Sequence, residues 1–161
     1  MGSSLYPPPT SPIARGVVSE SVELDDSALI GTTETVVYSQ SFTAEAGRRY
    51  KVTFQAASVD GDSGNQNASY GSKGSARLVM RWAAGTSATS GTFFGEKWVP
   101  TFGDDSMRST GTTMVGFFSP TTSGTHTVAL AMNMRYDTGG NVRFLMYGQG
   151  NKIFIEDAGP A

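Results

Sequence analysis

The chain has 161 residues and a formal charge of −2, with 20 glycines, no cysteine and one histidine. A chain of this length is typical of one domain, which buries roughly 70% of the surface of its unfolded form. The absence of cysteine excludes disulfides, thiolate catalysis and cysteine-based zinc sites, and one histidine cannot form a cluster of histidine ligands. No block of lysine or arginine is present, so we expect no nucleic-acid partner.

The composition favours strands. Charged residues make up 16% of the chain, and serine, threonine, asparagine and glycine supply most of its polar character. These residue types disfavour helices, because the polar side chains compete for backbone hydrogen bonds and glycine loses more entropy on ordering. No apolar run approaches the roughly 18 residues of a membrane-spanning helix, and the N-terminus has no secretory signal pattern. We expect an all-β protein made in the cytoplasm that stays soluble, with no membrane partner, unless it leaves the cell inside a larger particle.

Residues 1–14 are the first predicted unit, an extended N-terminal arm. Four of the seven prolines lie in this segment, which has no apolar periodicity. Such a composition favours the extended polyproline II conformation and builds no core of its own. Two interpretations remain open, a frayed terminus or an arm that docks on a neighbouring subunit or a partner.

Residues 15–161 are the second predicted unit, a β-sandwich domain. Apolar and polar residues alternate with the period of half-buried strands over 16–24, 33–42, 49–59, 76–83, 92–99, 112–119, 125–134, 142–147 and 152–156. In the third segment, the alternation predicts that Tyr50, Val52, Phe54 and Ala56 point inward. Eight or nine short strands without helical patterns or an internal repeat predict a jelly-roll-like β-sandwich.

Glycine and proline predict the connections. Long glycine- and serine-rich segments at 60–75 and 84–91 are expected to be loops at the ends of the sandwich. Pro100 and Gly103 are expected to interrupt the strand at 92–99. Glycine-rich turns on both sides of residues 142–147 predict a tight meander at the C-terminal end.

The candidate metal and catalytic groups are sparse. His126 shares a strand face with apolar side chains, and the sequence offers no nucleophile elbow that would supply it with a partner. We therefore expect His126 to be hydrogen-bonded or to lie at a subunit contact. The segment that begins at Asp60 resembles the start of a calcium loop, but Asn65 and Gly71 stand where an EF-hand needs glycine and glutamate. We predict no metal site and no cofactor.

The carboxylates do not form a recognisable catalytic pair. Asp104 and Asp105 are adjacent, so on a strand they would point to opposite faces, whereas glycoside hydrolysis needs two carboxylates that face one another. We expect no catalytic residue. Trp98 and Phe102 are the more informative aromatic residues, and they either stack on a sugar ring or belong to the core or a subunit interface.

Three segments carry a family resemblance. The stretch TTETVVYSQSFTAEAGRRYKVTFQAASVDG at 32–61, the ending KIFIEDAGPA at 152–161 and the lead PPPTSPIARGVV at 7–18 resemble small β-sandwich virion proteins of tailed bacteriophages of actinobacteria. The resemblance implies a head decoration protein or a minor tail or fibre component. Residues 62–140 resemble no family in the same way.

The resemblance leads to one functional expectation and one alternative. We expect a non-enzymatic capsid decoration, or cement, protein on the outer surface of the head, forming a homo-oligomer, most simply a trimer, and binding the major capsid protein. The arm residues expected to make this contact are Leu5, Tyr6, Pro7, Pro8, Pro9 and Ile13. The alternative is a tail or fibre module that binds host-surface glycan through Trp98 and Phe102.

Overall fold

Nine strands and no helix are present in residues 14–62, 73–102, 110–135, 141–145 and 150–161, which are the residues that the computed structural model describes. The strands are β1 (Gly16–Leu24), β2 (Thr35–Ala44), β3 (Arg48–Asp62), β4 (Lys73–Ala84), β5 (Thr92–Phe102), β6 (Thr110–Phe118), β7 (Gly124–Arg135), β8 (Asn141–Leu145) and β9 (Asn151–Pro160). Every pairing between them is antiparallel. The all-β prediction is confirmed.

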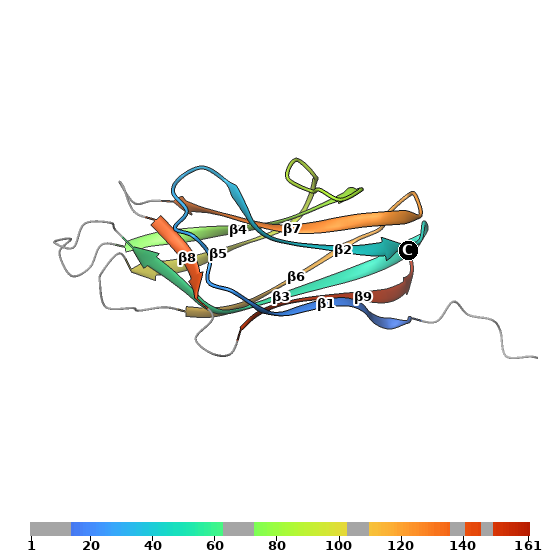
Figure 1. Cartoon of the computed structure of the whole chain (residues 1–161), viewed down its shortest axis with the longest axis horizontal. Coiled ribbons are helices and arrows are strands. Elements are labelled where there is room, and N and C mark those ends of the chain that lie inside the picture. The colour runs from blue at the N-terminus through green and yellow to red at the C-terminus, as the bar shows by residue number, and fades with distance from the viewer. Residues whose placement is uncertain (1–13, 63–72, 103–109, 136–140, 146–149) are drawn as a thin grey trace, which may run out of the picture.

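The strands form two layers (Figure 1). Sheet A has the order β1-β9-β3-β6, and β8 pairs with the far half of β3. Sheet B has the order β2-β7-β4-β5. The first strand pairs with the last, β2 with β7, β3 with β6, and β4 with β5. These nested pairs describe one long hairpin rolled into two sheets, which is the jelly-roll arrangement that the sequence predicts.

The inner faces of the two sheets form the core. Tyr50, Val52 and Phe54 of β3 are at most 2% exposed, as their alternation with polar neighbours predicts. Leu78 and Met80 of β4 are equally buried in sheet B. A cluster of aromatic rings fills the end of the core near the β2–β3 turn and contains Phe42, Tyr50, Trp82, Phe94 and Phe118. Large rings contribute much of the apolar area that a sandwich buries.

Three predictions about connections are wrong. β5 continues through Pro100 to Phe102 instead of ending before the proline. β5 is an edge strand, where a residue without an N–H is tolerated because that side of the backbone needs no ladder partner. The segment 60–75 is partly strand, because β3 runs to Asp62 and β4 begins at Lys73. The C-terminal meander is absent from the described pairings, since β8 pairs with β3 and not with β7 or β9.

Candidate binding surfaces

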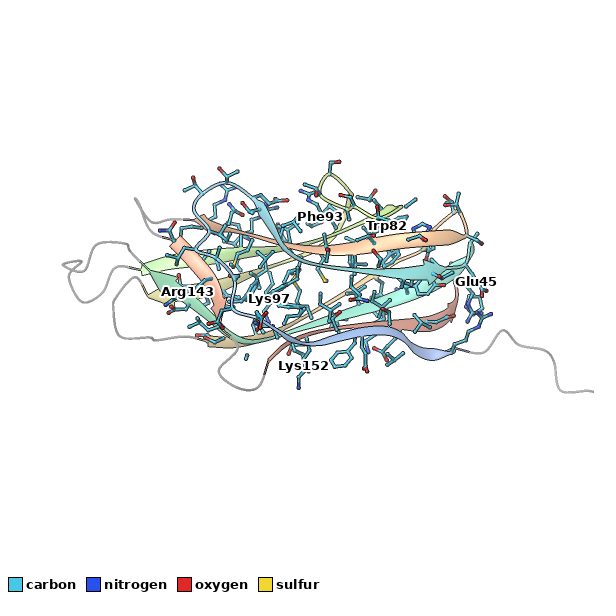
Figure 2. The ribbon with its side chains drawn as sticks, in the orientation of Figure 1. Glu45, Trp82, Phe93, Lys97, Arg143 and Lys152 are labelled. Atoms are coloured by element: carbon cyan, nitrogen blue, oxygen red, sulfur yellow. The ribbon has the colours of Figure 1, made fainter. Side chains whose placement is uncertain are left out.

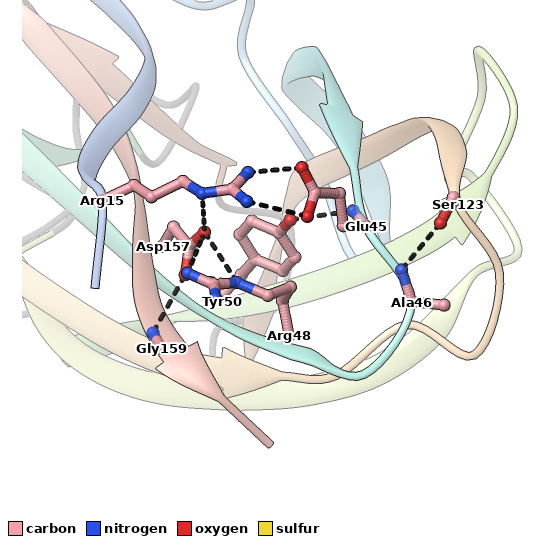
Figure 3. Close-up of polar contacts among 8 residues, drawn as sticks. All are labelled: Arg15, Glu45, Ala46, Arg48, Tyr50, Ser123, Asp157 and Gly159. Atoms are coloured by element: carbon pink, nitrogen blue, oxygen red, sulfur yellow. Dashed lines mark hydrogen bonds and ion pairs between the residues drawn. The ribbon is translucent and has the colours of Figure 1, made fainter. Parts of the chain in front are cut away.

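An ion-pair cluster holds the start of β1 at one end of the sandwich (Figure 3). The Arg15 guanidinium forms two hydrogen bonds with the Glu45 carboxylate, one of them at 3.0 Å from Nη2 to Oε2. The Arg15 amide also donates to the Asp157 carbonyl at 3.2 Å. The Arg15 contact lowers the pKa of Glu45, chiefly through the hydrogen bonds and then through the opposite charge. The chain therefore enters the sheet at a point held by both the β2–β3 turn and β9.

The same cluster contains a buried ion pair. Arg48 Nη2 lies 2.7 Å from both carboxylate oxygens of Asp157, and the Asp157 side chain is 1% exposed. Gly159 donates its amide to Asp157 Oδ1 at 2.9 Å, so the carboxylate is satisfied on both sides. Glycine is required at 159, where φ is +111°. The amide of Ala161 donates to the Gly47 carbonyl at 2.9 Å, which attaches the last strand to the β2–β3 turn.

The outer face of sheet A carries exposed apolar side chains. Strand register places Phe117 of β6 beside Lys51 of β3, and Val115 beside Thr53. Phe117 and Val115 are 44% and 49% exposed, and Val17 on β1 is 53% exposed on the same face. Phe154 of β9 is half-buried and stands beside Thr53 on this face, and we call Val17, Val115, Phe117 and Phe154 the apolar strip of sheet A.

The two cationic side chains next to Phe117 already have partners within the chain. Lys51 Nζ lies 2.6 Å from Glu156 Oε2 on the neighbouring strand β9. The Arg49 guanidinium lies 4.5 Å from the centre of the Phe117 ring, a cation–π contact. A partner that covers Phe117 would therefore desolvate two cations that already have compensating contacts.

The outer face of sheet B carries a network of charged side chains, in which one acidic residue binds two arginines. Glu34, just before β2, accepts a 2.7 Å hydrogen bond from Arg81 Nε and a 3.0 Å bond from Arg77 Nη1. Arg77 also donates to Glu96 on β5. The hydrogen bond from Arg81, with the charges of both arginines, lowers the pKa of Glu34 against an opposing effect of burial. No period or motif in the sequence indicates this network.

Two aromatic side chains lie on the same outer face of β5. Trp98 stands opposite Arg77 and is 41% exposed. Phe93 stands opposite Arg81 and is 48% exposed, a residue that the sequence reasoning did not single out. Figure 2 labels Phe93 on the side of sheet B. Of the roles left open for Trp98, its exposure excludes the core of the chain, while the side chain of Phe102, the last residue of β5, lies outside the described part of the structure.

The remaining predicted site residues are placed as follows. The arm residues Leu5, Tyr6, Pro7, Pro8, Pro9 and Ile13, and the pair Asp104 and Asp105, lie outside the described residues. His126 is buried, its Nε2 lies 3.0 Å from the Thr122 carbonyl, and its ring stacks on Trp82. The hydrogen-bonded role expected of His126 is confirmed.

Asp60 does not begin a solvated loop. Its side chain is 4% exposed and accepts a 3.1 Å hydrogen bond from Arg143 Nε, so the carboxylate is committed to an ion pair between β3 and β8. The described residues contain no group of three or more histidine, cysteine, aspartate or glutamate side chains arranged to hold a metal ion. Among the same residues, no helix of membrane-spanning length and apolarity occurs.

Comparison with solved structures returns matches of low similarity. A structure of TmCBM61 in complex with β-1,4-galactotriose is 12% identical, covering 84% of this chain and 67% of its own, with a TM-score of 0.31. A structure of the infectious bursal disease virus Gx strain is 9% identical, covering 99% of this chain, with a TM-score of 0.38. This chain spans 43% of that viral chain. At these TM-scores the matches carry no argument about function.

The sequence comparisons identify a family whose function is unknown. No curated protein matches this chain. The family model described as a domain of unknown function, DUF7298, matches residues 1–161. The chain therefore belongs to the DUF7298 family.

Proposed function

We propose that this chain is a non-enzymatic structural protein of a bacteriophage virion, a head decoration protein that binds the major capsid protein and reinforces the capsid lattice. The observation that carries the proposal is the apolar strip of sheet A, which lies on the face whose edge strand, β1, follows the N-terminal arm. The resemblance of three segments to virion proteins of tailed phages supports the same assignment. The protein would be made in the host cytoplasm and act on the outer surface of the head.

The proposed mechanism is mechanical. The arm residues Leu5, Tyr6, Pro7, Pro8, Pro9 and Ile13 would contact the lattice, and a proline-rich segment loses little conformational entropy when it docks. Arg15, held by Glu45 and Asp157, would transmit tension from the arm into both β9 and the β2–β3 turn. The apolar strip would cover the capsid surface, and several copies, in the simplest case a trimer, would bridge neighbouring capsid subunits.

The first test is the number of copies per virion, measured by quantitative mass spectrometry against the major capsid protein. Hundreds of copies are expected of a protein that follows the head lattice. A handful of copies would move the protein to the tail or fibre, and its absence from purified particles would overturn the virion assignment.

Deletion of residues 1–14 tests the arm. We expect the truncated protein to keep its circular dichroism spectrum and melting temperature, because the described core begins after the arm, and to lose binding to capsids that lack the protein. A matched control replaces Leu5, Tyr6 and Ile13 with serine, which keeps the length of the arm and removes its apolar side chains. Undiminished capsid binding by the truncated protein would contradict the anchoring role.

A second candidate function is favoured by the exposed side chains of Trp98 and Phe93. Two aromatic rings on one strand face, with Arg77, Glu96 and Arg81 beside them, offer stacking surfaces and hydrogen-bonding groups to a host-surface glycan. This arrangement suits a tail or fibre module. Trp98→Ala is then expected to reduce adsorption to host cells without lowering the melting temperature, and unchanged adsorption would dismiss this candidate.

A further inference from the structure

A polar groove opens where β3 changes its neighbour. Gln55 is the last residue of β3 paired with β9, and Ser58 is the first paired with β8. The pairing of β3 with β6 also shifts register between Ala56 and Val59. Bulges of this kind bend a strand and leave positions unpaired, and they are common beside binding sites. The groove at this position has a volume of about 480 Å³.

Two lysines reach this groove from opposite sheets. Lys152 lies on β9 of sheet A, and Lys97 lies on β5 of sheet B. The Lys97 ammonium donates to the Thr113 carbonyl at 2.9 Å, which draws the side chain over the edge strand β6. Figure 2 labels both lysines. We call this site the lysine groove, and its polar lining consists of Gln55, Lys97, Thr112, Thr113 and Lys152.

The rest of the lining is small. Alanine and glycine supply all the other described lining positions, Ala56, Ala57, Gly111 and Gly150. Larger side chains at these positions would occupy the volume. A Cβ at Gly111 would already lie 3.0 Å from the Ala57 carbonyl oxygen, so this position accepts no larger residue without movement of the backbone. The hollow is therefore a consequence of the sequence at the bulge.

The chemistry of the lining selects a class of ligand. None of the described lining residues is acidic, so the two ammonium groups present positive charge that no carboxylate of the groove neutralises. Hydroxyl and amide groups of Thr112, Thr113 and Gln55 both donate and accept hydrogen bonds, as sugar hydroxyls do. A volume of about 480 Å³ holds a sugar ring and is larger than a lone ion requires. We propose that the lysine groove binds a sugar unit that carries a carboxylate, which the positive charges of Lys97 and Lys152 attract, while the threonine and glutamine groups bind the ring hydroxyls.

This inference does not depend on the proposed virion function. It also concerns a surface other than the Trp98 and Phe93 face, since Gln55 and Lys152 lie on the outer side of sheet A. Binding at the lysine groove and binding on the outer face of sheet B can therefore be distinguished residue by residue.

The test is a titration of the ¹⁵N-labelled full chain followed by NMR, with sodium glucuronate, glucose and inorganic phosphate as separate probes. We expect glucuronate to shift the amide signals of Gln55, Thr112 and Thr113, and to bind at least about tenfold more tightly than glucose or phosphate. A charge-assisted hydrogen bond is strong enough to produce a difference of this size. If glucose bound as tightly as glucuronate, the proposed role of the carboxylate would be wrong. If phosphate bound as tightly as glucuronate, the proposal that the groove recognises a sugar would be wrong.

Charge-removing variants assign the binding to the groove. Lys97→Gln and Lys152→Gln keep most of the length of the side chain, and each is expected to weaken glucuronate binding by about tenfold or more. Lys51→Gln is the matched control on the same sheet, because Lys51 pairs with Glu156 and does not line the groove. Equal weakening by Lys51→Gln, or no signal shifts with glucuronate at all, would overturn the site.

Discussion

At the scale of single residues, the ion pair between Arg48 and Asp157 joins the start of β3 to β9. Both side chains are buried, and the Arg48 guanidinium faces the Asp157 carboxylate at 2.7 Å. Asp157→Asn is expected to lower the free energy of unfolding by about 3–5 kcal/mol, because it removes the carboxylate that faces the buried guanidinium at 2.7 Å. Urea unfolding monitored by tryptophan fluorescence measures this loss.

The double variant Arg48→Met with Asp157→Leu separates lost charge from lost packing. It is expected to be more stable than Asp157→Asn, since neither charge is left buried alone. Glu156→Gln removes an exposed ion pair with Lys51 and is expected to cost about 0–1 kcal/mol. A loss for Asp157→Asn as small as that for Glu156→Gln would show that the buried pair does not stabilise the fold.

Tyr38 is expected to make stability fall at alkaline pH. Burial raises its pKa from 10.0 to about 12, and its hydroxyl donates to the Asp25 carbonyl and accepts from Asn151 Nδ2 at 3.0 Å. The unfolded chain then loses the tyrosine proton at a lower pH than the folded chain, so the free energy of unfolding decreases as the pH rises from 10 to 12. Tyr38→Phe is expected to reduce this slope and to cost roughly 1–2 kcal/mol at neutral pH through the lost hydrogen bonds.

The measurement is a series of denaturant unfolding curves between neutral and alkaline pH for both proteins. Parallel profiles for the wild type and Tyr38→Phe would contradict the prediction. The alternation of residues 33–42 predicts that Tyr38 faces the same side as Phe42, but its partners Asp25 and Asn151 lie far away in sequence. Such pairs depend on strand order, which local patterns do not encode.

At the scale of elements, β6 depends on a glycine for its approach to sheet B. A Cβ at Gly116 would lie 2.7 Å from Met80 Cε and 2.7 Å from Phe94 Cδ2, so a side chain there meets both β4 and β5. Gly116→Ala is expected to lower the free energy of unfolding by about 1–3 kcal/mol through overpacking. Val115→Thr, on the exposed face of the same strand, is expected to change it by no more than about 0.5 kcal/mol. Equal stability of the two variants in urea unfolding would contradict this account.

The strands also show where element prediction succeeds. Alternation placed β1 at 16–24 and identified Tyr50, Val52 and Phe54 as inward residues, because side chains along a strand point to opposite faces in turn. It also predicted a strand at 142–147 but not its partner, since β8 pairs with the far end of β3 instead of forming a meander. β3 extends beyond the residues that pair with β9, and this extension leaves an open edge with which β8 pairs. Local alternation cannot show which edge is open, because that depends on how distant strands pack.

At the scale of the whole molecule, the two outer faces predict different roles. Sheet A presents the apolar strip, whereas the charges of Glu34, Arg77 and Arg81 lie across sheet B. If the proposed decoration function holds, Phe117→Lys is expected to reduce the number of copies bound per capsid at least about tenfold, because a charge would be buried in the contact. Ser39→Lys, on the outer face of sheet B, is the control and is expected to bind normally. Capsid binding assayed by sedimentation checks both, and equal occupancy would exclude sheet A as the docking face.

Local sequence patterns predict the fold of this chain better than they predict its candidate binding surfaces. The composition and the alternation of residues are enough to predict an all-β jelly-roll-like sandwich and its inward side chains, because both depend on neighbours within a few residues. The sequence also indicated Trp98, but it gave no sign of Phe93, the apolar strip of sheet A or the lysine groove. Each of these surfaces combines residues from different strands, and Lys97 and Lys152 even come from different sheets. Their proximity follows from the nested pairing of the first strand with the last, which only the packing of the complete chain brings about.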